Sequence, residues 1–198
     1  VDTLFNAWNT LRRNVVKGAI DEMMREHEVG LTRALRVVND NLIAYARAAL
    51  ARGAAGIFFS VPASTEFVSR EQYERYMRPF DLELLEAIRG RGSLHVLHAH
   101  GNHVFFDRML DYPVQAISWA DQDAGPTLAE ARRRTDLPLM GGISHGRFAY
   151  ESAGHIRGQI KRSIDDAGRE KLFLAPGCAL PSYAFPELIR AAHAAAAR

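Results

Sequence analysis

Short apolar runs alternate with longer stretches of mixed polarity along the whole of this chain. The short runs are rich in β-branched and aromatic residues and are bounded by turn-forming residues, a pattern that predicts strands. Six strands are predicted, over residues 2–6, 56–61, 94–98, 115–119, 137–141 and 171–175.

The stretches between these runs have the spacing of amphipathic helices. Within residues 32–52, apolar positions three or four apart form one face: Leu35, Val38, Leu42, Ala46 and Ala49. Gly53 then provides a stop at the carboxyl end. Further helices are predicted over residues 152–167 and from Phe185 to the end of the chain, where Pro186 suits a first turn.

Two capping boxes predict the starts of two more helices. They lie at residues 69–72 and 127–130, where Ser or Thr is followed three positions later by Gln or Glu. The first of these helices should run to about residue 89 and should be kinked by Pro79, which cannot donate a helical hydrogen bond.

Alternation of strands and helices predicts an α/β fold with a parallel sheet. An open doubly wound sheet and a (β/α)8 TIM barrel both have this alternation, but no glycine-rich phosphate-binding motif follows any of the six runs. Polar residues instead follow several different strands, as at the active-site face of a barrel: Ser60, residues 98–103, residues 119–123, Ser144, His145 and Cys178. We therefore expect an incomplete TIM barrel of about six βα units.

A complete barrel has eight such units, so this chain is expected to lack an amino-terminal quarter, and nothing in it marks a second domain. An open barrel leaves two strand edges and much apolar surface uncovered. We expect either further chain or a partner, as in a homodimer, to cover these edges.

Composition excludes several classes of protein. The 198 residues are 47% hydrophobic with a formal charge of +2, and no basic run indicates a nucleic-acid partner. No apolar run approaches the length of a membrane-spanning helix. Cys178 is the single cysteine, so no disulfide forms within the chain and a reducing, cytoplasmic location is expected.

The stretch LHAHGN places His98 and His100 two residues apart at the end of a predicted strand. Residues two apart in a strand project to the same side, so both imidazoles could bind one metal ion. In a barrel the loop that carries Cys178 opens onto the same mouth, which gives three ligands and an open fourth position, typical of catalytic zinc. The alternative is a pair of hydrogen-bonded histidines and a buried, inert cysteine.

Other polar residues near the predicted strand ends are candidates for the same pocket. Asp121 and His145 could transfer protons. Five residues could contact a small-molecule substrate: Ser60, Asn102, His103, Trp119 and Tyr183. The alternative for each of them is an ordinary polar or packing position in a loop.

The chain contains an ordered series of motifs: GAAGIFF, SREQYERYMRPFDLELLEAI, VLHAHGN, AISWADQ, LMGGIS and LFLAPGCALP. This series resembles the uroporphyrinogen decarboxylase superfamily. The resemblance covers nearly the whole chain. It implies a (β/α)8 barrel of which residues 1–198 are the C-terminal two-thirds, the third to eighth βα units.

The resemblance implies two chemistries. One branch transfers a methyl group from a corrinoid to a thiol, using zinc held by a motif like LHxCGN and a distant PGC cysteine. His98 matches the histidine of that motif, His100 stands where its first cysteine would be, and Cys178 matches the second. This branch implies zinc, a corrinoid or methylated small molecule as the methyl donor, and a corrinoid protein as a partner.

The other branch consists of cofactor-free uroporphyrinogen decarboxylases of porphyrin biosynthesis. Asn14 stands where these enzymes carry a substrate-facing tyrosine, and Cys178 stands where they usually carry histidine. These differences favour the methyltransferase branch. A third reading, a non-catalytic module that binds a tetrapyrrole or corrinoid, remains open.

Overall fold

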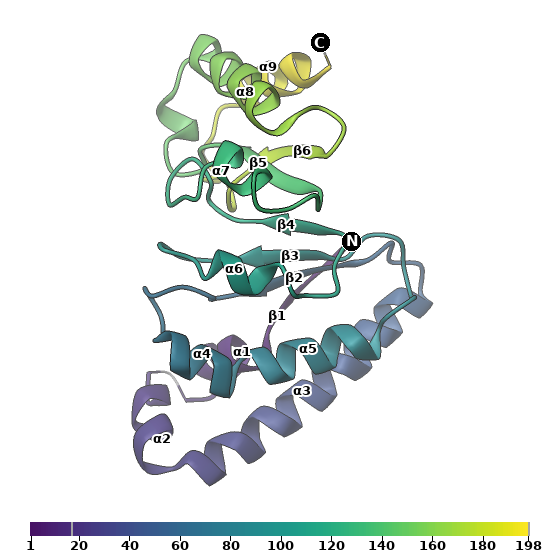
Figure 1. Ribbon diagram of the computed structural model, residues 1–198, viewed down its shortest axis with the longest axis vertical. Helices are drawn as coiled ribbons and strands as arrows, with labels where there is room; N and C mark the ends of the chain where they lie inside the picture. Colours follow the sequence, from purple (N-terminus) through teal and green to yellow (C-terminus); the bar gives the residue numbers. More distant parts are fainter. Residues whose placement is uncertain (17, 198) are drawn as a thin grey trace.

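The computed structural model describes residues 1–16 and 18–197, and its centre is one sheet of six parallel strands. The strands cross the sheet in chain order: β1 (Asp2–Phe5), β2 (Ile57–Val61), β3 (Val96–Ala99), β4 (Ala116–Ser118), β5 (Leu139–Ile143) and β6 (Leu172–Pro176). Within the described residues the sheet does not close, because β1 and β6 lie at opposite edges (Figure 1). The predicted α/β fold and incomplete TIM barrel are confirmed.

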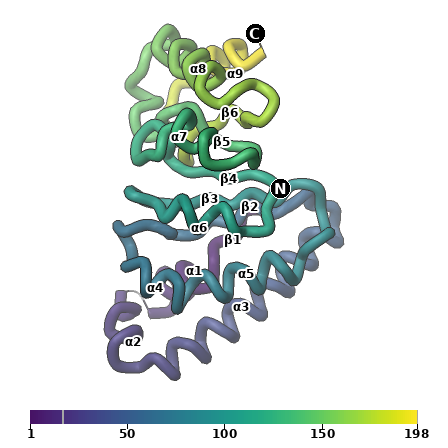
Figure 2. The backbone as a smooth tube through the Cα atoms, in the orientation of Figure 1, coloured from purple at the N-terminus to yellow at the C-terminus, as the bar shows by residue number. Residues whose placement is uncertain are grey.

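The helices follow the strands as crossover connections; the longer ones lie at the two ends of the molecule, and the short α6 and α7 lie between them (Figure 1, Figure 2). Helices α1 to α5 lie beside the first strands, and α8 and α9 lie beside β5 and β6. Their bounds are α1 (Ala7–Asn14), α2 (Ile20–Glu26), α3 (Glu28–Ala51), α4 (Arg70–Tyr76), α5 (Arg78–Ala87), α6 (Phe106–Met109), α7 (Leu128–Arg132), α8 (Ala153–Ala167) and α9 (Pro186–Ala196), with a 3-10 turn at Phe148–Tyr150.

Both predicted capping boxes are present, at Ser69 with Gln72 and at Thr127 with Glu130. The single helix expected after Ser69 is instead two helices, α4 and α5, which meet at Met77. Pro79 lies in the first turn of α5, where its missing N–H costs nothing, so the chain restarts a helix rather than bending one.

The register of the sheet sorts its residues into two faces. One row across the sheet is apolar and packs against the helices: Leu4, Phe59, Leu97, Ile117, Leu139 and Leu172. The next row points to the opposite face and is mixed: Phe5, Ser60, His98, Ser118, Met140 and Phe173. Because side chains alternate along each strand, the mixed row faces what would be the interior of a closed barrel.

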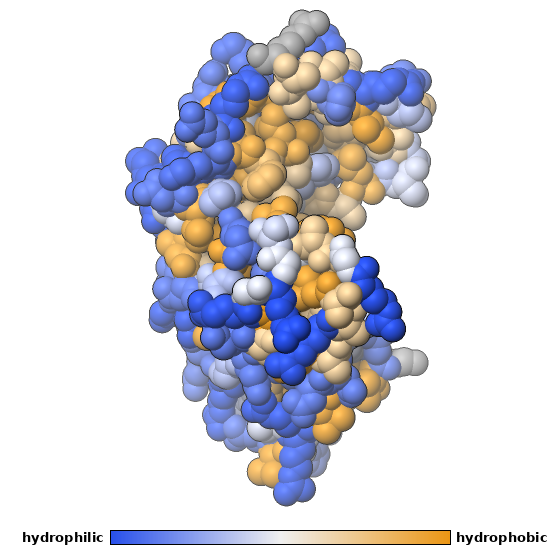
Figure 3. Space-filling view, turned by 90° about the vertical axis from the view of Figure 1, so that its right-hand side faces the viewer, coloured by the Kyte–Doolittle hydropathy of each residue, from blue (hydrophilic) through white to orange (hydrophobic). Residues whose placement is uncertain are grey.

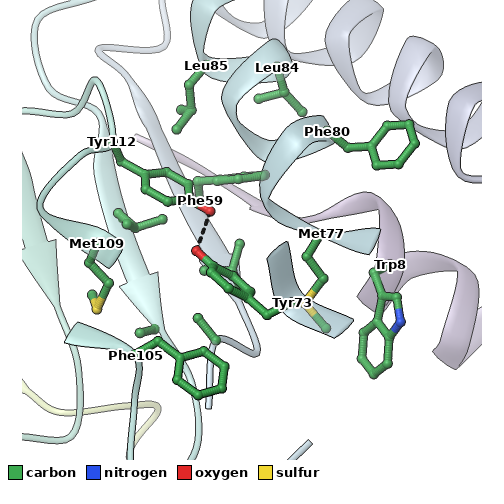
Figure 4. Packing of buried hydrophobic residues seen from close by; sticks show 14 of the residues in the cluster. Trp8, Phe59, Tyr73, Met77, Phe80, Leu84, Leu85, Phe105, Met109 and Tyr112 are labelled. Atoms are coloured by element: carbon green, nitrogen blue, oxygen red, sulfur yellow. Dashed lines mark hydrogen bonds between the residues drawn. The ribbon is translucent and has the colours of Figure 1, made fainter. Parts of the chain in front are cut away.

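The larger core lies between β1–β4 and their helices (Figure 4). It contains a buried polar chain in which the hydroxyls of Tyr73 and Tyr112 lie 2.6 Å apart and that of Tyr112 donates to Asp81. Asn6, at the end of β1, donates to the other oxygen of the Asp81 carboxylate. These hydrogen bonds satisfy polar groups whose burial without a partner would destabilise the folded state.

A smaller core lies between β5 and helices α8 and α9, and is formed by Ile143, Phe148, Ile156, Ile160 and Leu188. Seen from the side, the molecule is indented midway along its long axis, with apolar residues along the indentation (Figure 3). Among the helices of the described residues, none combines the length and the apolar character needed to cross a membrane.

Candidate metal centre

Strand β3 brings His98 and His100 to the same side of the sheet, because they are two residues apart along an extended chain. His98 is buried in the middle of the sheet, whereas His100 is exposed just beyond the end of the strand. Their rings lie 6.1 Å apart between centroids. The spacing therefore directs one histidine to the floor of the concave face and the other to its rim.

The His98 ring is held on two sides. Its Nδ1 lies 3.2 Å from the hydroxyl of Ser118, the residue in register with it on β4, and Phe58 stacks against it with ring centroids 5.3 Å apart. Burial lowers the pKa of His98 to about 4, because the charged imidazolium loses its hydration. The ring is therefore neutral at neutral pH, with Nε2 left available as a metal ligand.

Cys178 reaches this face from the turn that follows β6. Gly177 N–H donates to the Ile143 carbonyl, and a β-carbon at Gly177 would lie 2.6 Å from Ala120 Cα. Only glycine allows the turn to approach the β4 loop so closely. The turn sets Cys178 Sγ 3.7 Å from His100 Nδ1, and this hydrogen bond lowers the pKa of the thiol, which favours the thiolate.

The three side chains form a donor set suited to zinc. One ligand atom each from His98, His100 and Cys178 can be chosen so that all lie within 4.8 Å of one another. Tetrahedral zinc with nitrogen and sulfur ligands needs ligand separations of roughly 3.3–3.6 Å, so the 3.7 Å from Cys178 to His100 is close to the required geometry. Two nitrogens and one thiolate are also ligands that zinc prefers.

A pocket of about 590 Å³ opens over these three residues. Its floor is the mixed row of the sheet, and its wall is helix α1. The residues that line it are Val1, Thr3, Phe5, Asn9, Arg12, Arg13, Phe58, Ser60, Pro62, Phe67, His98, His100, Ser118, Met140, Ala175, Pro176, Cys178 and Ala179. This volume suits a small molecule.

The other residues expected in the pocket are placed in several different environments. Ser60 lines it, in register with His98 on the neighbouring strand. Trp119 points to the helical core instead, where its indole N–H donates to the Pro126 carbonyl and its ring meets Phe106 edge to face. Ser118, one residue earlier, is the residue that faces the pocket.

Asp121 and His145 are the expected proton-transfer residues. Asp121 joins the loop after β4 to strand β5, and His145, just after β5, contacts that same loop. The buried Asp121 carboxylate accepts hydrogen bonds from the Gly142 N–H and from Gln122, and burial raises its pKa. His145 Nδ1 lies 3.1 Å from Asp123, whose other carboxylate oxygen accepts the Ser144 hydroxyl. Neither residue is among those that line the pocket over His98 and Cys178, and proton transfer by them stays a prediction.

Asn102 and His103 lie in a separate depression with Glu66 and Asp123. The backbone and side-chain amides of Asn102 both donate to Glu66, and His103 adopts a left-handed conformation with φ of 54°. Tyr183 is exposed, with its hydroxyl 2.9 Å from that of Tyr150. The structure therefore brings together His98, His100, Cys178 and Ser60, but places these three residues elsewhere.

Among the pocket residues that the sequence analysis did not predict are Arg12, Arg13, Phe67 and Ser118. The alternation rule would have selected Ser118, because it shares its phase with the strand positions that face the pocket. The spacing of Trp8 and Arg12, four apart, was also a signal, since such residues meet on one side of a helix.

Comparisons with known proteins agree with this fold. A search of curated proteins gives no match. A methyltransferase from Methanosarcina mazei has a similar structure, with a TM-score of 0.84 at 20% identity over 98% of this chain. A B12-independent methionine synthase from Shewanella sp. W3-18-1, solved in complex with selenomethionine, has a TM-score of 0.61 at 15% identity over 84% of this chain.

This chain spans 57% of that methyltransferase chain and 53% of that methionine synthase chain. At these identities the two likenesses show a shared fold. The family model described as Uroporphyrinogen decarboxylase (URO-D) matches residues 17–198. With nearly the whole sequence matched, the chain belongs to the uroporphyrinogen decarboxylase family.

Proposed function

We propose that this chain carries the metal centre of an enzyme that transfers a methyl group to a thiol. The observation that carries the proposal is the convergence of His98, His100 and Cys178 from two distant parts of the chain on one pocket. A cofactor-free decarboxylase has no need of such a cluster. The likeness to a methyltransferase and a methionine synthase supports the same reading of the pocket.

Zinc, held by His98, His100 and Cys178, would supply a Lewis acid that lowers the pKa of an acceptor thiol. The chain's own residues prepare that site. Burial keeps His98 neutral and able to act as a ligand, while Ser118 fixes which of its nitrogens faces the pocket. The hydrogen bond with His100 favours the thiolate form of Cys178.

Two neutral histidines and one thiolate leave a dipositive ion with a net charge of +1. A set of one histidine and two thiolates would leave no net charge. We infer that histidine at position 100 favours the deprotonation of an incoming thiol more strongly, but makes the bound sulfur less nucleophilic.

In the transfer itself, the acceptor sulfur forms a bond to the methyl carbon as the bond from that carbon to the donor breaks. The electron pair of the broken bond stays with the donor, and the thiol proton has already passed to solvent. The apolar side chains of Phe58, Phe67 and Met140 in the pocket lining would exclude water from the reacting sulfur.

We propose a corrinoid, carried by a partner protein, or a methylated small molecule as the donor. It would approach over the carboxyl ends of the strands, where the pocket opens. We further propose that residues 1–198 form the later units of one barrel domain, and that the unpaired edges of β1 and β6 are covered by other units or by a second copy.

Metal analysis of the purified protein tests the proposal directly. We expect about one zinc per chain in the wild type and far less in Cys178→Ser, because three protein ligands are needed to hold a catalytic ion. His193→Ala, which changes an exposed histidine on α9, is the matched control and should keep its zinc. Sub-stoichiometric zinc in all three proteins, or zinc-independent decarboxylation of uroporphyrinogen, would contradict the proposal.

A further inference from the structure

A buried carboxyl group is hydrogen-bonded to the residue that caps helix α1, the wall of the pocket. Asp81, on α5, is 1% exposed, and its two oxygens accept hydrogen bonds from Asn6 Nδ2 and from the Tyr112 hydroxyl, each at 3.0 Å. The Tyr112 hydroxyl in turn contacts that of Tyr73 on α4 (Figure 4). Four separate parts of the chain therefore meet at one ionisable group.

Asn6 connects this carboxyl group to helix α1. Its side-chain oxygen accepts from the Asn9 N–H, 2.9 Å away, and so caps the first turn of α1, while its amide nitrogen donates to Asp81. Its backbone N–H donates to the Ser60 carbonyl on β2. Because both ends of the amide are engaged, a rotation of the Asn6 side chain that breaks the contact with Asp81 also breaks the cap.

The number of hydrogen atoms in this network fits the ionised form of Asp81. With the carboxylate charged, Asn6 donates to one oxygen and Tyr112 to the other, while Tyr73 donates to Tyr112, so each contact has one hydrogen. A proton on the oxygen that faces Asn6 would set two donors against each other. A proton on the other oxygen would reverse the chain and leave the Tyr73 hydrogen without an acceptor within the described residues. Protonation therefore weakens the network at one end or the other.

Ionisation of Asp81 is balanced against its burial. Hydrogen bonds to a charged carboxylate are roughly twice as strong as those to a neutral group, but burial disfavours the charge and raises the pKa of Asp81 to about 7. Arg78, on the same helix, favours the charged form. The charged or titratable side chains on the surrounding elements are paired with one another: Arg78 with Glu74 and Asp111, Arg36 with Glu83, and Tyr73 with Tyr112. Both forms of Asp81 are therefore populated near neutral pH.

Helix α1 connects its cap to the pocket. Asn9 and Arg12 of this helix line the pocket. The guanidinium carbon of Arg12 lies 5.4 Å from the ring centroid of Phe67, and Phe67 stacks on His100 with ring centroids 5.6 Å apart. A shift of α1 would therefore change both the width of the pocket and the surroundings of one proposed metal ligand.

We infer that Asp81 is a positioning residue for helix α1: its ionised carboxylate holds the Asn6 cap and keeps the helix against the sheet, and its protonation makes the helix more mobile. The fold thus contains a pH-sensitive control on the wall of the pocket. This local effect is opposite in sign to the global one, because the folded state binds the Asp81 proton more tightly than the unfolded state and gains stability as the pH falls. The inference is independent of the metal centre, since none of these groups is a proposed ligand.

Hydrogen exchange of the α1 amides tests this inference, measured by mass spectrometry and corrected for the intrinsic effect of pH. Between pH 8 and pH 5.5 the corrected exchange of α1 should become about five- to tenfold faster, as the difference between hydrogen bonds to charged and to neutral partners implies. Asp81→Asn should exchange at the faster rate at both pH values, because an amide carries no charge. Asp136→Asn, at an exposed site paired with Lys171, is the matched control and should behave as the wild type does.

Asn6→Ser separates positioning from a purely structural function of Asp81. Serine can still cap α1, but its side chain is too short to reach Asp81 as well. The pH dependence of α1 exchange should disappear in this variant, while the pH dependence of global unfolding stays, since Asp81 still titrates. A pH dependence of α1 exchange that survives in Asn6→Ser would contradict the inference, and this variant also provides the test if Asp81→Asn fails to fold.

Trp8, buried in the first turn of α1, provides a second signal. In Trp119→Phe it is the one tryptophan left, and its emission should change with a midpoint near pH 7. Exchange and emission that both stay constant between pH 5.5 and 8 would overturn the inference. A change that persists in Asp81→Asn would also overturn it, because other titrating groups, such as the histidines, would then be its cause.

Discussion

The two ends of the sheet differ in how completely they are packed. In the β1–β4 region, which includes helices α1–α7, every residue of β3 and β4 is buried and the helices form one continuous core with the sheet. In the β5–β6 region, which includes α8 and α9, no residue of β6 is fully buried and Phe173 is 42% exposed. The proposed centre draws His98 and His100 from the first region and Cys178 from the second.

The proposed site therefore joins a fully buried part of the sheet to a part that is less completely buried. The histidines are positioned by a strand that has neighbours on both sides and helices behind it. The cysteine depends on an edge strand and on the turn at Gly177. A metal ion would therefore act as a cross-link between the two regions, and its binding should depend on their docking.

The difference in packing between the two regions should have its largest effect on stability when a buried phenylalanine is removed from each of them. Phe59→Ala, in the β1–β4 core, should lower the free energy of unfolding by about 3–5 kcal/mol, because its fully buried surroundings cannot close the cavity. Phe148→Ala, in the small core, should cost less because a thinly packed surrounding relaxes more easily. Urea denaturation followed by circular dichroism measures both.

Tryptophan fluorescence adds a local signal, since both tryptophans, Trp8 and Trp119, lie in the β1–β4 core. Phe148→Ala should shift the circular dichroism transition more than the fluorescence transition. Equal losses of stability in the two variants, with coincident transitions, would show that the molecule unfolds as one unit and would contradict the contrast.

The buried carboxyl group of Asp81 makes the β1–β4 region sensitive to pH. Burial raises its pKa to about 7, outweighing the hydrogen bonds from Asn6 and Tyr112. The pKa of an aspartate in the unfolded chain is about 3.9, so between about pH 4 and 7 the folded state binds the Asp81 proton more tightly than the unfolded state does. The free energy of unfolding therefore falls as the pH rises through this range. The fall should approach about 1.4 kcal/mol per pH unit at its steepest.

Asp81→Asn should remove this pH dependence, because an amide can still accept from Asn6 and can donate to the Tyr112 hydroxyl. Unfolding curves at pH 4.5, 6 and 8, followed by tryptophan fluorescence, measure the change. Asp136→Asn, at an exposed site of the β5–β6 region, is the control and should keep the wild-type pH profile. An Asp81→Asn profile that still falls between about pH 4 and 7 would show that other groups carry the dependence.

Zinc binding is expected to reduce the difference in stability between the β1–β4 and β5–β6 regions. At a free concentration of about one hundred times its dissociation constant, it should raise the free energy of unfolding by about 2.7 kcal/mol. Hydrogen exchange should slow most along β6 and the turn at Cys178, because that side of the cross-link is the less stable one. The same zinc addition to Cys178→Ser is the control, and similar protection there would argue against the centre.

A smaller effect is expected from the hydroxyl group behind His98. Ser118→Ala removes the contact that orients the ring, and should weaken zinc binding about 10–100-fold without unfolding the protein. Ser60→Ala is the matched control, since Ser60 flanks His98 in register on the other side and makes no hydrogen bond to it within the described chain. Competition with a chelator measures both affinities, and equal losses would exclude an orienting function of Ser118.

Most of the fold could be predicted from the sequence because its strands are short apolar runs between clear turn signals. The alternation of side chains also places His98 and His100 together without any knowledge of the fold. The helices that were missed are short. Helix α1 begins at an Asn6 cap that the predicted first strand included, and α6 is a single turn of four residues. Such elements are stabilised by tertiary packing, which local patterns do not record.

The pocket beyond the histidines could be predicted only in part. Trp119 was predicted to contact the substrate, but Ser118, one position earlier, is the residue that lines the pocket, because neighbouring residues of an extended chain point to opposite faces. The environment of Arg12 depends on Trp8 and on Phe67 from a distant loop. Contacts between separate elements of this kind follow from packing in three dimensions and have no local signature.

The smallest effect is expected from removing one helix cap in each region, and this pair of changes compares the two regions most directly. Ser69 caps α4 in the β1–β4 region, and Ser152 caps α8 in the β5–β6 region. Each change to Ala should cost about 1 kcal/mol, since each removes one hydrogen bond to an otherwise unpaired N–H of the first turn. If the regions unfold separately, Ser69→Ala shifts the fluorescence transition and Ser152→Ala shifts circular dichroism alone. With saturating zinc, the fluorescence and circular dichroism transitions should coincide in both variants, because a cross-link through Cys178 makes the less stable region unfold together with the more stable one. Transitions that remain separate with zinc bound would show that the centre does not couple the two regions.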